Sequence, residues 1–122
     1  MQLFANIMVG LVALQHVFFL TLEMFLWQKP LGRKIFRMSA EQAASTAVLA
    51  ANQGLYNGFL AAGLIWAILY PSDYFSRHLA LFFLGCVLAA AAYGGSTVGK
   101  KILFIQGGPA LVALIATLCW GL

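Results

Sequence analysis

Charged residues are scarce in this chain: they make up 8% of its 122 residues, whereas hydrophobic residues make up 63%. A soluble domain carries roughly 25% charged residues. So few charges do not cover the surface of a small water-soluble protein, whereas a bilayer stabilises an apolar exterior. The composition therefore argues against a soluble domain and indicates one small integral membrane domain spanning 1–122.

Cysteine and acidic residues are also few. Cys86 and Cys119 both lie inside apolar stretches, without a CxxC pair or a Cys/His cluster. We therefore expect neither a disulfide framework nor a metal site. The net charge of +4 does not predict nucleic-acid binding, because six of the seven basic residues occupy two short connections rather than one basic face.

Long apolar stretches fill the rest of the sequence. A membrane-spanning helix needs about 20 residues, and four stretches are long enough. The start Met1-Gln2-Leu3-Phe4 has no basic segment, so we expect the first stretch to be a retained helix rather than a signal peptide. The sequence predicts an all-α polytopic membrane protein, a four-transmembrane-helix bundle with helices at about 3–27, 40–70, 73–97 and 101–121.

Two local signals fix details of these helices. Ser39-Ala40-Glu41-Gln42 matches a capping box, with Ser39 as the N-cap and Gln42 at N3. Pro109, preceded by two glycines, leaves the carbonyl of Ile105 without its usual donor. We therefore predict a bend or a broken hydrogen-bond ladder between Ile105 and Pro109.

The basic residues also predict the orientation of the chain. The connections 28–39 and 94–101 hold six Lys and Arg, whereas the opposite side holds only Arg77. Short loops rich in Lys and Arg stay in the cytosol. We therefore expect both connections to be cytosolic, the N and C termini both to lie outside, and the protein to reside in the cytoplasmic (inner) membrane.

The second helix is predicted to have two opposed faces. One face is small, and its Gly54-xxx-Gly58 pair favours close packing of a neighbouring helix, either within the protomer or in a homodimer through the Gly54/Gly58 face. The other face is polar. It carries Gln42, Ser45, Thr46, Asn52, Gln53, Tyr56 and Asn57.

His16 and Glu23 are the main candidates for chemistry. They are seven residues apart, share a face of the first helix and differ in depth by about 10 Å. We expect both to point, with Asn52, Gln53 and Asn57, into one cavity in the cytosolic half, since intramembrane ionisable groups usually face the bundle interior. Six residues are candidates for binding a ligand: Asn52, Gln53, Tyr56, Asn57, Tyr93 and Gln106.

Structural roles compete with these assignments. An amide such as Asn57 or Gln53 also serves as a hydrogen-bonding contact between helices. Glu23 lies near the interface, where it would reach water by snorkelling or pair with Arg33 or Lys34.

The stretches Ala13-Leu14-Gln15-His16, Leu22-Glu23-Met24-Phe25-Leu26-Trp27 and 51–63 resemble a bacterial membrane-protein family, domain of unknown function 1304. The resemblance spans essentially the whole chain, and the stretch 51–63 (ANQGLYNGFLAAG) is its most specific part. It implies a small polytopic membrane fold and does not imply an activity.

The leading functional hypothesis is an intramembrane polar pocket for a small, partly apolar or quinone-like ligand. If it catalyses a reaction, His16 and Glu23 are the acid/base pair. The alternatives are a subunit of a small proton-coupled transporter, which would need a dimer, and a structural or assembly protein in which the polar groups hold helices together. No pattern identifies a cofactor.

Overall fold

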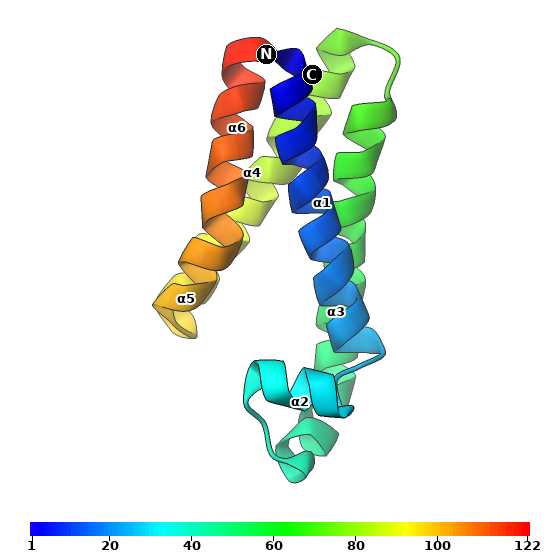
Figure 1. Ribbon diagram of the computed structural model, residues 1–122, viewed down its shortest axis with the longest axis vertical. Helices are drawn as coiled ribbons and strands as arrows, with labels where there is room; N and C mark the ends of the chain where they lie inside the picture. Colours follow the sequence, from blue (N-terminus) through cyan, green and yellow to red (C-terminus); the bar gives the residue numbers. More distant parts are fainter. The chain divides into compact units, whose positions relative to one another are not determined.

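The computed structural model describes residues 1–122, and every regular element in it is helical (Figure 1). The elements in chain order are α1 (Gln2–Met24), α2 (Pro30–Phe36), α3 (Ala40–Leu69), α4 (Asp73–Thr97), α5 (Lys100–Ile102), the π-helical η1 (Leu103–Gly107) and α6 (Gly108–Trp120).

The start of α3 is fixed by the predicted capping box. The backbone N–H of Gln42 donates to Ser39 Oγ at 3.1 Å, and the backbone N–H of Ser39 donates to Gln42 Oε1 at 3.0 Å. Each side chain thus satisfies a backbone donor of the other residue. This prediction is confirmed.

Three helical stretches are long and apolar enough to cross a membrane: Gln2–Met24, Asp73–Thr97 and Lys100–Trp120. The 30-residue α3 is long enough but does not reach the same hydropathy. Asn52, Gln53 and Asn57, near the middle of α3, lower its mean hydropathy. The three apolar helices indicate a membrane-associated protein.

Large apolar side chains are exposed on α1, α3 and α4. Leu14, Leu69 and Phe82, from three different helices, are 64%, 74% and 65% exposed. Monomeric soluble proteins rarely expose contiguous apolar surface on this scale. Lipid contact accounts for it.

The chain divides into two compact units, of which the first comprises residues 1–14 and 60–122. Its core is built largely from alanine, which lets helices approach closely. Three side chains tie its ends together: Ser76 Oγ donates to Ala67 O at 2.6 Å, Arg77 Nη2 to Leu118 O at 2.6 Å, and Gln2 Nε2 to Leu122 O at 2.9 Å. The starts of α1 and α4 therefore lie at the same end of this unit as the ends of α3 and α6.

The last apolar stretch departs from α-helical bonding where a disturbance was predicted. Residues Leu103–Gly107 form a π-helix, and α6 begins at Gly108 with Pro109 in its first turn. The disturbance thus lies slightly earlier than the predicted interval of 105–109. The first turn of a helix tolerates proline, because the N–H that proline lacks would have no intrahelical acceptor there.

The second unit comprises residues 15–59. It contains the end of α1, the start of α3 and, between them, α2. The sequence predicts a connection at 28–39, yet Pro30 begins a helix there and Arg37 ends it in the left-handed conformation, at φ 52°. The Met38 N–H then donates to Arg33 O at 2.9 Å, which satisfies a terminal carbonyl. The helix α1 ends at Met24, three residues before its predicted end.

Candidate functional site

A hydrogen bond between α1 and α3 is the centre of the candidate site. Asn57 Nδ2 donates to Glu23 Oε1 at 2.7 Å, and both side chains are half-buried. The sequence predicts that Glu23 and His16 point into one cavity with Asn52, Gln53 and Asn57, so a contact between Glu23 or His16 and one of these amides is expected. That contact is present, and it joins the carboxyl group to a specific amide.

Two glycines let α1 and α3 approach closely enough for this bond to form. A methyl group placed on Gly54 would lie 2.6 Å from Met24 Cγ and 3.2 Å from Leu20 O, and one on Gly58 would lie 2.6 Å from Leu20 Cδ1. The predicted helix–helix contact at Gly54 and Gly58 is confirmed, and it lies within the chain, against α1.

The description of two opposed faces is corrected by these contacts. Asn57 turns toward α1 together with Gly54 and Gly58, because residues three and four apart in a helix share one side. Asn52 and Gln53 belong to the exposed side. The face that approaches α1 therefore carries both the small residues and the one amide that meets the carboxyl group.

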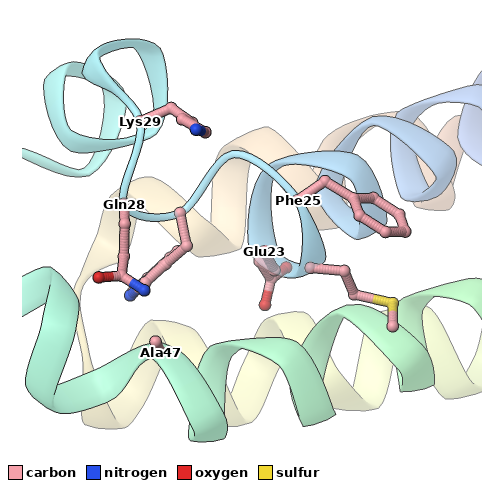
Figure 2. Close-up of a pocket in the computed structure, with 7 residues that line it drawn as sticks. Glu23, Phe25, Gln28, Lys29 and Ala47 are labelled. Atoms are coloured by element: carbon pink, nitrogen blue, oxygen red, sulfur yellow. The ribbon is translucent and has the colours of Figure 1, made fainter.

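A pocket of about 350 Å³ opens beside Glu23 within the second unit. Figure 2 shows the carboxyl group of Glu23 turned toward α3, with Gln28 extending from the connection toward Ala47 of α3. The lining combines an acidic, an amide and a basic residue with apolar and aromatic residues. Its residues are Glu23, Met24, Phe25, Trp27, Gln28, Lys29 and Ala47.

The helix α2 and its neighbours hold the wall of this pocket in place. Trp27 Nε1 donates to Thr46 Oγ1 at 3.0 Å, and the Trp27 ring packs on Phe36 with centroids 4.7 Å apart. Gly32 is buried, and a methyl group on it would overlap the Leu26 carbonyl oxygen. Only glycine therefore allows α2 to pack this tightly under the end of α1.

His16 lies inside the protein but does not line this pocket. Its side chain is fully buried, and its ring meets Phe19 edge-on with centroids 5.6 Å apart. A buried imidazole next to an aromatic ring fits both a packing role and a role in proton transfer.

The other predicted site residues are not gathered around Glu23. Asn52, Gln53 and Tyr56 are exposed on α3, and none of them lines the pocket. Tyr93 on α4 is 73% exposed, and Gln106 is half-buried in η1. Both belong to the first unit. The structure thus brings together Glu23 and Asn57 from the predicted set.

Six lining residues were not among the predicted site residues: Met24, Phe25, Trp27, Gln28, Lys29 and Ala47. Trp27 lies in the turn that follows α1, three residues beyond Met24, so helical spacing from Glu23 does not place it at the pocket. The sequence indicated only that Gln28 and Lys29 lie in a connection that sets the orientation of the chain. A local turn, rather than helical periodicity, directs them to the site. The Lys29 N–H donates to Leu26 O at 3.1 Å in that turn.

The arrangement offers hydrogen-bond acceptors and donors beside an apolar wall. Glu23 Oε1 accepts from Asn57, and a carboxyl group has a second oxygen that is able to meet another donor. Lys29 also lines the pocket. Such a site suits a small molecule with one polar end and an apolar body.

Comparison with known proteins identifies relatives over most of the chain. Residues 10–118 match the family described as "Protein of unknown function (DUF1304)". The "Uncharacterized protein YpaA" of Lactococcus lactis subsp. lactis (strain IL1403) is 36% identical over 109 residues, which cover 88% of this chain and 90% of that protein. No solved structure matches. The chain therefore belongs to the DUF1304 family.

Proposed function

We propose that this chain is a four-span membrane protein whose Glu23 pocket binds a small, partly apolar ligand at the cytosolic side. The fourth span is α3, in addition to the three apolar stretches. Its 30 residues give a length of about 45 Å at 1.5 Å per residue, which exceeds the bilayer core.

The hydrogen bonds at one end of the first unit support this span count. The start of α4 bonds to the end of α3 through Ser76 and Ala67, and to the end of α6 through Arg77 and Leu118. The end of α6 in turn meets the start of α1, through Gln2 and Leu122. If α1 crosses the bilayer, α3 must return across it to bring the chain back to that end.

The distribution of charge supports the orientation. Lys29, Arg33, Lys34 and Arg37 follow α1, and Lys100 and Lys101 follow α4, so six basic residues flank one side. By the positive-inside rule that side is cytosolic in the cytoplasmic membrane, and both termini lie outside. Glu23, one residue before the end of α1, is then near the cytosolic interface.

The observation that carries the binding function is the Glu23–Asn57 hydrogen bond at the wall of an open pocket. A carboxyl group that served only to join two helices would need no hollow of about 350 Å³ beside it. The ligand presents a hydrogen-bond donor to Glu23 and lays its apolar part along Met24, Phe25 and Trp27. If chemistry follows binding, Glu23 is the group placed to move a proton.

Native mass spectrometry of the detergent-purified protein tests this function. We expect a small molecule to remain bound to the wild-type protein and to be lost from Glu23→Ala. Glu41→Ala, which removes an exposed carboxylate of α3 outside the pocket, is the matched control and should retain the molecule. Absence of any retained molecule, or equal retention by a folded Glu23→Ala protein, would contradict the proposal.

A transport role is the second candidate, and η1 is the observation that favours it. π-helical turns inside α-helices occur frequently at functional sites, and interrupted membrane helices supply backbone carbonyls for coupling ions. In this proposal Glu23 carries the coupled proton. Reconstituted liposomes should then show proton-driven substrate flux that disappears in Glu23→Gln, whereas binding alone predicts no flux.

A further inference from the structure

A second hollow lies in the first unit, at the end where α1 begins and α6 ends. Its volume is about 510 Å³. It shares no residue with the Glu23 pocket and belongs to the other unit. Its lining residues are Gln2, Asp73, Tyr74, Arg77, His78, Leu81, Trp120, Gly121 and Leu122.

The ends of all three apolar spans meet at this hollow. Gln2 begins α1, Asp73 begins α4 and Trp120 ends α6. Because spans of 21 to 25 residues just cross a bilayer, their ends lie at the depth of the lipid headgroups. Trp120 and Tyr74 are the aromatic types that concentrate at this depth.

Two opposite charges line the hollow without being paired to each other. Asp73 and Arg77 are four residues apart on α4, yet Arg77 Nη2 donates to Leu118 O at 2.6 Å. The carbonyl thus fixes the guanidinium group at the hollow. A guanidinium has five N–H donors in a planar fork, so others remain for an anion such as a phosphate.

His78 adds a second acceptor to the lining of this hollow. Its Nδ1 lies 2.7 Å from Tyr74 O, and its ring is 4.2 Å from the Tyr74 ring, centroid to centroid. Because a carbonyl oxygen only accepts, Nδ1 carries the hydrogen. In the neutral imidazole Nε2 is then an acceptor. The hollow therefore offers a guanidinium donor and two groups able to accept from an ammonium.

We propose that this hollow holds the headgroup of a phospholipid that carries both a phosphate and a primary ammonium. Arg77 binds the phosphate, Asp73 and His78 accept from the ammonium, and Leu81 and Trp120 contact the glycerol and the first acyl carbons. A choline headgroup lacks N–H donors for Asp73. A glycerol headgroup lacks the positive charge.

Lipid titration followed by native mass spectrometry tests this site. Phosphatidylethanolamine, phosphatidylcholine and phosphatidylglycerol with identical acyl chains are added to the detergent-purified protein. We expect the ethanolamine lipid to bind about tenfold more tightly than the choline lipid, a difference equivalent to roughly 1.4 kcal/mol. Asp73→Asn should abolish this preference, and Arg77→Gln should weaken the binding of all three lipids.

Lys101→Gln is the matched control, because it removes an exposed basic residue of the same unit that does not line the hollow. It should keep the wild-type preference. If Arg77→Gln does not fold, Arg77→Lys keeps the charge but loses the planar fork, and it should also weaken binding. Equal binding of the three lipids by the wild type would overturn the proposal. So would a preference that survives Asp73→Asn, or binding of free glycerophosphoethanolamine as tight as that of the lipid.

Discussion

At the residue scale, the Glu23–Asn57 pair distinguishes this chain from a purely apolar bundle. A charged side chain at the centre of a bilayer costs about 2.5–3.5 kcal/mol on insertion scales. Glu23 avoids part of that cost by lying at the end of α1 and by accepting a hydrogen bond from Asn57 at 2.7 Å. The pair is therefore a contact between helices as well as the polar element of a pocket.

A double-mutant cycle measures how much this bond stabilises the fold. Glu23→Ala, Asn57→Ala and the double variant are compared by reversible unfolding in mixed micelles. Side-chain hydrogen bonds in membrane proteins contribute about 0.6 kcal/mol on average and up to about 1.7 kcal/mol. We expect a coupling energy within that range. The same cycle with exposed Gln53 in place of Asn57 should give none, and coupling of equal size there would argue against a specific pair.

At Gly32, a side chain added by substitution would clash with backbone atoms rather than with other side chains. A methyl group there overlaps the Leu26 carbonyl oxygen and would lie 3.0 Å from the carbonyl oxygen of Trp27, and neither of these atoms is able to rotate away. Gly32→Ala should therefore destabilise the protein by about 1–3 kcal/mol. The free energy of unfolding measures this effect. Gly85→Ala is the control with open space around it, and an equal loss in both variants would contradict the packing described here.

At the element scale, the contact between α1 and α3 depends on Gly54 more than on Gly58. A methyl group on Gly54 meets backbone oxygen and Glu23 Cβ, whereas one on Gly58 meets only the mobile end of Leu20. Gly54→Ala should thus cost more stability than Gly58→Ala, while the larger Gly58→Leu should also disrupt the packing. Unfolding free energies of the three variants provide the measurement. The reverse order for the two alanine variants would show that the helices pack differently.

The helices also differ in how well the sequence predicts them. Hydropathy and caps were sufficient for the long helices, because Ser39 with Gln42 and the prolines act locally. The helix α2 was missed because its seven residues are too short for a periodic signal, and its packing depends on the carbonyl of Leu26. Among the site residues, Glu23 could be identified from the sequence, because a carboxyl group within an apolar span is energetically unfavourable unless it faces the protein interior. Its partner could not be singled out from three amides, since that choice depends on how α3 turns toward α1.

The π-helical η1 makes a further prediction at this scale. Pro109 lacks the N–H that a regular α-helix would donate to Ile105 O. Pro109→Ala restores this donor, so we expect the segment 103–107 to return to α-helical bonding and its amides to exchange hydrogen more slowly. Hydrogen exchange by mass spectrometry detects the difference. Unchanged protection would mean that packing of Gly94 and Gly95 against Ile102 and Leu103, rather than the proline, imposes the π-helix.

At the scale of the whole molecule, the proposed topology requires α3 to cross the bilayer. Only three stretches reach the hydropathy of a membrane span, because the amides of α3 lower its average. Yet α3 ends beside the start of α4, at the end of the first unit where Gln2 and Leu122 meet. We propose a fourth crossing, by α3, which is consistent with both facts. In that proposal Glu23 and its pocket lie at the cytosolic side.

Cysteine labelling tests this central claim most directly. In a background of Cys86→Ser and Cys119→Ser, single cysteines replace Gln2, Phe36 and Ser72, all of which lie outside the cores of the spans. A membrane-impermeant maleimide added to intact spheroplasts should label positions 2 and 72, and should label position 36 only after lysis. Labelling of 72 only after lysis would show that α3 does not cross, and labelling of 36 alone in intact cells would reverse the orientation and place the Glu23 pocket on the outer side.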